Sequence, residues 1–122
     1  MIDVYASFAA LLNHELPTGV APDSRDQLNN FLGTDTIGCD YVVQQNLNNT
    51  LSIIQNNWKY IEPSDKPALE HWTKMETGNN PQPQLYDLSV DPSEKENLAG
   101  THPDKVKELA ILLEKVKAAK TK

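Results

Sequence analysis

Three histidines and one cysteine are the side chains of this sequence best suited to metal, acid–base or nucleophilic chemistry. His14, His71 and His102 lie far apart, and none has a partner at a metal-ligand spacing such as H-x-x-x-H or C-x-x-C. The sequence places no base beside Cys39, so a half-buried packing role is favoured over that of a nucleophile. We therefore predict no catalytic residue and no metal ligand in this chain.

Charge and hydropathy exclude several classes of protein. The 122 residues include 11 Lys and Arg against 17 Asp and Glu, which gives a formal net charge of −6. This balance argues against nucleic acid as a partner, because nucleic acid needs a basic footprint. The longest apolar run, Phe8 to Leu12, is too short to span a membrane. The first basic residue is Arg25, so no secretory leader is predicted in this segment.

The N-terminal residues predict an unusual helix. Residues 2–12 are rich in Ala and Leu and contain neither Gly nor Pro, so they favour a helix that is apolar on most of its sides. Leaving Phe8, Leu11 or Leu12 in water forfeits roughly 2 kcal/mol each. Either this is a core helix of the domain, or the neighbour that covers it is missing from the chain.

The remaining residues predict an α+β fold. Strand-like runs at 40–45, 51–55, 58–61 and 84–88 predict an antiparallel sheet of about four strands, with Asn56-Asn57 as a hairpin turn. A long C-terminal helix over residues 101–122 carries an apolar stripe that would pack on one face of the sheet. Residues 13–38 are loop-like, apart from a helical turn near 28–32. Residues 63–83 form an insertion too long for an ordinary hairpin loop.

The segment 91–98 has a local structural interpretation. Asp91 suits the cap of a short helical turn, Pro92 suits its first position, and Glu94 suits the return position of a capping box.

The order of motifs resembles the C-terminal portion of a type I sulfatase, the arylsulfatase family. Residues 51–61, LSIIQNNWKYI, resemble that family's L-S-I-R-x-G-D-W-K-L-I, with Ile54 and Asn56 replacing Arg and Gly. Residues 85–99 match L-Y-D-L-x-x-D-P-x-E-x-x-N-L-A, and residues 3–11 resemble D-x-x-x-T-L-x-x-L. The resemblance covers essentially the whole chain.

The resemblance implies that the catalytic groups lie in a different part of the enzyme from this segment. Sulfatases of this type use a formylglycine, made in a C/S-x-P-x-R motif, and a divalent cation, usually calcium. Cys39 has neither Pro at +2 nor Arg at +4, so it is not the formylglycine precursor. We therefore expect the cofactors and catalytic groups in a missing N-terminal catalytic α/β domain, and we predict that this chain alone is inactive. Residues 1–38 would form the edge of that domain, and residues 39–122 the C-terminal subdomain that caps it and shapes the substrate cleft.

Four residues are candidates for the rim of the cleft: Lys59, His71, Trp72 and Lys74. Cations and an aromatic ring suit a sulfated sugar or aryl ligand, although all four residues also fit ordinary surface or packing roles. The apolar helix Met1–Leu12 would meet the catalytic domain or self-associate in its absence. The parent of such a segment could be periplasmic or secreted. A rival interpretation is a stand-alone protein-interaction module, because an exposed apolar helix beside a small sheet could bind a protein partner.

Overall fold

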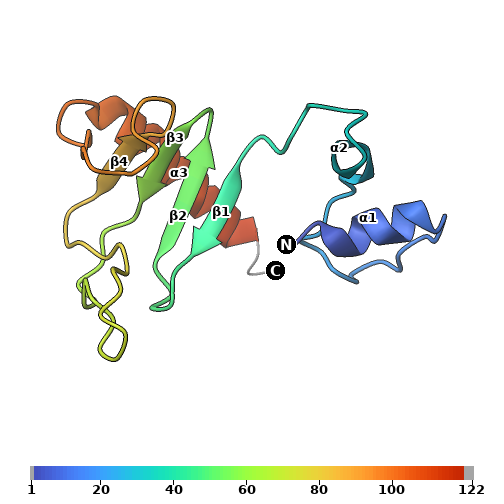
Figure 1. Ribbon diagram of the computed structural model, residues 1–122, viewed down its shortest axis with the longest axis horizontal. Helices are drawn as coiled ribbons and strands as arrows, with labels where there is room; N and C mark the ends of the chain where they lie inside the picture. Colours follow the sequence, from blue (N-terminus) through green and yellow to red (C-terminus); the bar gives the residue numbers. More distant parts are fainter. Residues whose placement is uncertain (1, 120–122) are drawn as a thin grey trace. The chain divides into compact units, whose positions relative to one another are not determined.

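The computed structural model describes residues 2–119 of the chain (Figure 1). The chain forms two compact units, Met1–Cys39 and Asp40–Lys122. The first unit contains the helices α1, Val4–Leu11, and α2, Leu28–Phe31. The second contains four strands and the helix α3, Pro103–Ala119. No helix within the described residues has the length and apolar character needed to cross a membrane.

Helix α1 is held in its unit by polar contacts. The Ser7 hydroxyl is 1% exposed, donates to the Asp3 carbonyl at 2.7 Å and accepts the backbone N–H of Gln27 at 2.8 Å. Most of the large apolar residues of α1 and its flanks are exposed instead, with Phe8 at 59% and Leu12 at 75%. The interpretation of this segment as a buried core helix is therefore wrong, because its small unit supplies no second apolar layer to cover it.

The second unit is built on an antiparallel sheet with the strand order β1-β2-β3-β4. The strands are β1, Val42–Gln45; β2, Leu51–Gln55; β3, Trp58–Ile61; and β4, Gln84–Asp87. Asn56 and Asn57 join β2 to β3 with φ of 48° and 67°. Two consecutive left-handed residues match the twist of a tight hairpin, and Asn tolerates this conformation better than most residues.

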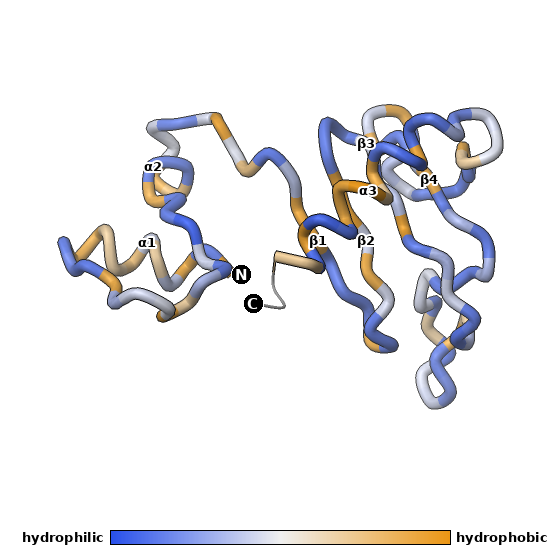
Figure 2. Tube along the Cα trace, turned by 180° about the vertical axis from the view of Figure 1, so that it is seen from behind, coloured by the Kyte–Doolittle hydropathy of each residue, from blue (hydrophilic) through white to orange (hydrophobic). Residues whose placement is uncertain are grey.

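One face of the sheet forms the core with α3. Ile53, Tyr60 and Leu85 form one cross-strand row, and they pack with Leu109 and Leu113 of α3. Figure 1 shows α3 lying across this face, and in Figure 2 the hydrophobic stretches of the unit gather on the strands and on α3. The predicted α+β fold, with four antiparallel strands and a long C-terminal helix, is confirmed.

The segment 91–98 differs from its prediction. It contains no helix. The Asp91 carboxylate accepts the backbone N–H groups of Lys95 and Glu96 at 2.7 and 2.8 Å, and therefore caps a loop rather than a helix. Glu94 adopts a left-handed φ of 54°, which a capping box does not use.

Candidate functional site

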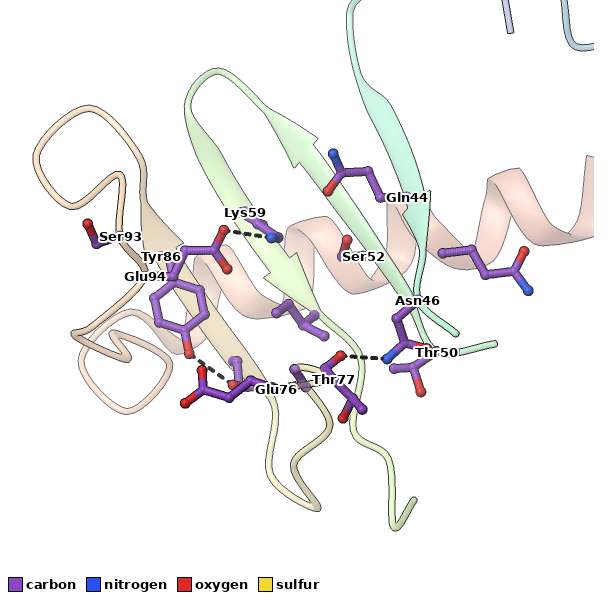
Figure 3. A pocket seen from close by; sticks show the side chains of 14 residues that line it. Gln44, Asn46, Thr50, Ser52, Lys59, Glu76, Thr77, Tyr86, Ser93 and Glu94 are labelled. Carbon is purple, nitrogen blue, oxygen red and sulfur yellow. Dashed lines mark hydrogen bonds and ion pairs between the residues drawn. The ribbon is translucent and has the colours of Figure 1, made fainter. Parts of the chain in front are cut away.

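The sheet face opposite α3 is polar. Because side chains alternate along a strand, Lys59 and Tyr86, which are register partners, point away from the face that packs on α3. Ser52 and Gln84 are paired with Ile61 on that same polar face. The face is hollowed into a cavity of about 410 Å³. Its lining residues come from all four strands, from the turn between β1 and β2, from the loop after β3 and from the segment after β4 (Figure 3): Gln44, Gln45, Asn46, Thr50, Ser52, Lys59, Ile61, Glu76, Thr77, Gly78, Gln84, Tyr86, Ser93 and Glu94.

An ion pair crosses one side of this cavity. Lys59 Nζ lies 2.6 Å from Glu94 Oε1, and the two side chains are 15% and 31% exposed. Figure 3 shows the two side chains pointing toward one another. Lys59 is positioned by the alternation of β3, and Glu94 by its left-handed backbone in the loop after β4. The positive charge at this point is therefore already neutralised within the unit.

A buried phenol lies on the same face. The Tyr86 hydroxyl donates to Gln84 Oε1 at 2.9 Å, and both residues are less than 9% exposed. Burial, together with the negative charges of Glu94 and Asp91, raises the pKa of Tyr86 above its ordinary value. The phenol therefore stays protonated and acts as a hydrogen-bond donor at neutral pH.

The loop between β3 and β4 is tied to the end of the sheet by asparagines. Asn46 Nδ2 donates to the Thr77 carbonyl and to Asn79 Oδ1, both at 2.8 Å. Asn79, which is 5% exposed, donates in turn to the Pro67 carbonyl at 3.0 Å. These contacts hold both sides of the loop against the sheet, so its distal turn is presented from a fixed base.

The distal turn forms a second cavity of about 310 Å³, lined by Asn48, Pro67, Leu69, Glu70, His71 and Lys74. An isolated antiparallel bridge between Leu69 and Glu76 closes the turn. Glu70 Oε2 accepts the backbone N–H groups of Trp72 and Thr73 at 2.7 and 2.6 Å. The hydrogen bond from the Thr73 backbone is the largest of several that lower the pKa of Glu70, so its carboxylate is charged at neutral pH.

The four predicted rim residues do not gather at one place. Lys59 lines the cavity on the sheet face, whereas His71 and Lys74 line the cavity in the distal turn. Trp72 lines neither of these two cavities and is 85% exposed, with its ring 4.9 Å from that of His71.

Sequence reasoning missed several residues of the sheet-face cavity. The sequence predicts that Glu94 takes the return position of a capping box, yet Glu94 pairs with Lys59 from 35 residues away. The contributions of Gln84 and Asn46 also depend on long-range register rather than on local pattern. Lys59 and Glu94 each lie in a motif that matches the sulfatase family, W-K and D-P-x-E. Neither motif indicates that the two side chains are in contact.

Amides, hydroxyls and a phenol dominate the sheet-face cavity, and its lining contains no His or Cys. These groups can donate to and accept from sugar-like hydroxyls. Within residues 2–119, no group of three or more His, Cys, Asp and Glu side chains could hold a metal ion. Cys39 is half-buried and accepts a 3.5 Å contact from Gln27 Nε2.

Comparisons with known proteins relate this chain to sulfatases. No family model matches the chain. It is 62% identical over 116 residues to an N-acetylgalactosamine-6-O-sulfatase of Bacteroides thetaiotaomicron, which covers 95% of this chain and 23% of that protein. It is also 38% identical over 60 residues to arylsulfatase K of Xenopus laevis, covering 49% of this chain and 9% of that protein.

Solved structures agree with this relationship. A structure from work on glycosaminoglycan metabolism by Bacteroides thetaiotaomicron has a TM-score of 0.91 and 61% identity, covering 95% of this chain and 24% of that one. The structure of Ps i-CgsB, with a TM-score of 0.62 and 20% identity, shares the fold over 93% of this chain and 23% of its own. The chain thus spans about a quarter of the length of the N-acetylgalactosamine-6-O-sulfatase, and about a quarter of the Bacteroides thetaiotaomicron structure. By sequence and by fold, this chain is a close homologue of one portion of a sulfatase.

Proposed function

We propose that this chain is the supporting subdomain of a sulfatase that removes the 6-O-sulfate of N-acetylgalactosamine. The observation that carries the proposal is the 62% identity to a sulfatase of that specificity, which extends over nearly all of the chain. The sheet and α3 share one hydrophobic core, and long loops on such a scaffold are a common place for specificity contacts.

The reaction itself belongs, in this proposal, to the part of the sulfatase outside this chain. A formylglycine and a calcium ion, which the sulfatase motifs imply, would be held there. Neither group fits the described residues, because Cys39 lacks the required motif and no cluster of metal-binding side chains is present among residues 2–119. The chain on its own is expected to show no turnover.

The role of this subdomain is to cap the catalytic region and to form part of the cleft rim. Lys59, His71, Trp72 and Lys74 are the proposed rim residues. Lys59 would act together with Glu94, because the ion pair fixes the ammonium group in one position. His71, Trp72 and Lys74 would act from the distal turn, which the asparagine contacts hold in place.

Helix α1 is the proposed contact with the rest of the enzyme. A cavity of about 430 Å³ lies along its apolar side, lined by Val4, Tyr5, Phe8, Ala9, Leu12, His14 and Leu16. Burying such a surface against the catalytic region would recover the hydrophobic free energy that exposure forfeits. Residue 1 of the proposed Met1–Leu12 contact lies outside the described residues.

A domain exchange tests the proposal. This chain replaces its homologous segment in the Bacteroides thetaiotaomicron sulfatase, and hydrolysis of N-acetylgalactosamine 6-sulfate is compared among the chimera, the unchanged enzyme and the isolated chain. We expect the chimera to keep activity within about tenfold of the unchanged enzyme, since 62% identity preserves most contacts. Turnover by the isolated chain, or a folded chimera with no activity, would overturn the proposal.

The stand-alone interaction module remains the second candidate, and the exposed apolar side of α1 is the observation that favours it. The reading frame upstream of Met1 separates the two candidates. A C/S-x-P-x-R motif in the same frame supports the sulfatase subdomain, and a stop codon supports the module.

A further inference from the structure

Trp72 has an environment that folding alone does not explain. It is 85% exposed, which is the highest value among the large apolar side chains of residues 2–119. An exposed indole forgoes roughly 2 kcal/mol or more of burial free energy. A single exposed aromatic residue on a mobile tail would need no explanation, but this one is held on an ordered turn.

Three sets of contacts fix the position of Trp72. Its own backbone N–H donates to Glu70 Oε2 at 2.7 Å, and Glu70 also accepts the Thr73 hydroxyl at 3.0 Å. The turn is closed by backbone hydrogen bonds from Glu70 to Met75 and from Lys74 to Glu70, at 2.9 and 3.1 Å. The His71 ring then packs against the indole at an interplanar angle of 84°.

The cavity beside this indole has mixed chemistry. Pro67 and Leu69 supply apolar walls, and Asn48 supplies an amide. Lys74 supplies an ammonium group that forms no ion pair with any of residues 2–119. Lys74 also holds a left-handed φ of 58°, a conformation that costs free energy for a non-glycine residue. The turn thus carries a cation that lines its cavity, and an exposed aromatic ring that contacts a second lining residue, His71.

We propose that the distal turn, residues 67–76, is a subsite for a second sugar unit of the substrate chain, one that carries a negative charge. The pyranose ring would stack on Trp72, because sugar rings present apolar C–H faces that suit an aromatic surface. Lys74 would bind the carboxylate or sulfate of that unit. The subsite rests on the proposed function for the identity of the sulfated sugar, and it assigns to the turn a different sugar, joined to the one that loses its sulfate.

The separation of the two cavities supports this assignment. Lys59 is already paired with Glu94 in the sheet-face cavity, whereas Lys74 is available in the turn. Glu70 lines the same cavity as Lys74, but its carboxylate is committed to backbone and hydroxyl donors of the turn. Lys74 is therefore a better candidate than Lys59 for binding an anionic group of a ligand.

The first experiment measures binding by the 122-residue chain. The probe is a tetrasaccharide of alternating glucuronic acid and 6-O-sulfated N-acetylgalactosamine, titrated by calorimetry and by tryptophan fluorescence. We expect Trp72→Ala to weaken binding by about tenfold or more and Trp72→Phe to weaken it less, because Phe keeps an aromatic face. Val90→Ala, a change at a residue that is 78% exposed, is the matched control. Absence of binding by the wild-type chain, or equal binding by Trp72→Ala, overturns the subsite.

The charge contribution has its own variant. Lys74→Asn removes the ammonium group while placing a residue that tolerates the left-handed φ. We expect it to weaken binding of the charged tetrasaccharide and to leave binding of its carboxyl-reduced, desulfated counterpart unchanged. Equal effects on both ligands overturn the assignment of Lys74.

A second experiment separates this subsite from the proposed function. In the chimeric sulfatase, Trp72→Ala should raise KM for the tetrasaccharide about tenfold, and it should affect N-acetylgalactosamine 6-sulfate, which has no second sugar, by a clearly smaller factor. An inactive chimera contradicts the proposed function, whereas the binding titration still decides the subsite. An active chimera in which Trp72→Ala affects both substrates equally contradicts the subsite alone.

Discussion

Lys59 Nζ lies 2.6 Å from Glu94 Oε1 and joins the centre of the sheet to the loop that follows its last strand. The pair connects two motifs, W-K in β3 and D-P-x-E after β4, that are 35 residues apart. Glu94 makes this contact from a left-handed backbone conformation. A non-glycine residue in that conformation needs compensation, and the ion pair provides it.

Breaking the pair should destabilise the sheet unit. Glu94→Gln leaves the ammonium group of Lys59, whose side chain is 15% exposed, without its charged partner. We expect a loss of about 1–2 kcal/mol in the free energy of unfolding, between the values for surface and fully buried pairs. Urea denaturation provides the measurement. Lys105→Met is the control, because its pair with Glu108 is more exposed and should contribute only about 0.3 kcal/mol. Equal losses in the two variants would show that the Lys59–Glu94 pair has no special role.

Asn97 should be important for stability although its side chain is not buried. Its Oδ1 accepts the backbone N–H of Leu85, a fully buried residue of β4, and that of Ala99, both at 3.0 Å. Asn97→Ala leaves the Leu85 N–H unsatisfied, at a cost of about 1–3 kcal/mol.

Asn97→Asp keeps the accepting oxygen and should cost less than Asn97→Ala. The control is Asn80→Ala, which removes an exposed side-chain bond to the backbone of Gln82. Thermal unfolding of the three variants checks the order, and an Asn97→Ala protein as stable as Asn80→Ala would contradict it.

The sheet unit should lose stability at alkaline pH. Burial, aided by the charge of Glu62, raises the pKa of Tyr60 above its ordinary value near 10. As the pH rises past 10, the unfolded chain therefore releases this proton while the folded chain retains it. Since the folded state then binds more protons than the unfolded state, the free energy of unfolding falls with rising pH.

Tyr60→Phe should make this alkaline decline less steep. Lys117 contributes in the same direction, because its hydrogen bonds to Glu114 and Glu62 raise its pKa, so part of the decline should remain. Urea midpoints at several pH values from 7 to 11 provide the test. At pH 7 the free energies of unfolding of the variant and the wild type should agree within about 0.5 kcal/mol. If stability falls in parallel for both proteins up to pH 11, Tyr60 does not contribute to the decline.

The fold was predictable where local pattern decides it. Asn56 and Asn57 suit left-handed turn positions by themselves, and the alternation of Trp58, Lys59, Tyr60 and Ile61 assigns each side chain to one face of the sheet. The apolar stripe of α3 likewise matches the buried Leu109 and Leu113.

The candidate site was less predictable because its contacts are long-range. Asn46 meets Asn79 from 33 residues away, and no local pattern marks either asparagine as an anchor of the loop. The capping-box prediction for Glu94 is wrong because its neighbours Asp91 and Pro92 fit a helix start by local pattern, whereas the partner that pairs with Glu94 lies in β3. The separation of Lys59 from Trp72 and Lys74 depends on where the asparagines hold the loop, which the sequence does not express.

The apolar side of α1 should make the isolated chain self-associate when no catalytic region covers it. Phe8 is 59% exposed and lines the cavity along the helix, so Phe8→Ser removes apolar contact area without disturbing a core. We expect the variant to sediment as a smaller species than the wild type at the same concentration, with an unfolding free energy changed by less than about 0.5 kcal/mol. Val90→Ser, at a residue that is 78% exposed in the sheet unit, is the matched control and should leave the association unchanged. Sedimentation velocity over a range of concentrations measures the association state of the three proteins. A wild-type chain that remains monomeric throughout, or a Val90→Ser variant that dissociates as readily as Phe8→Ser, would remove α1 as the contact surface.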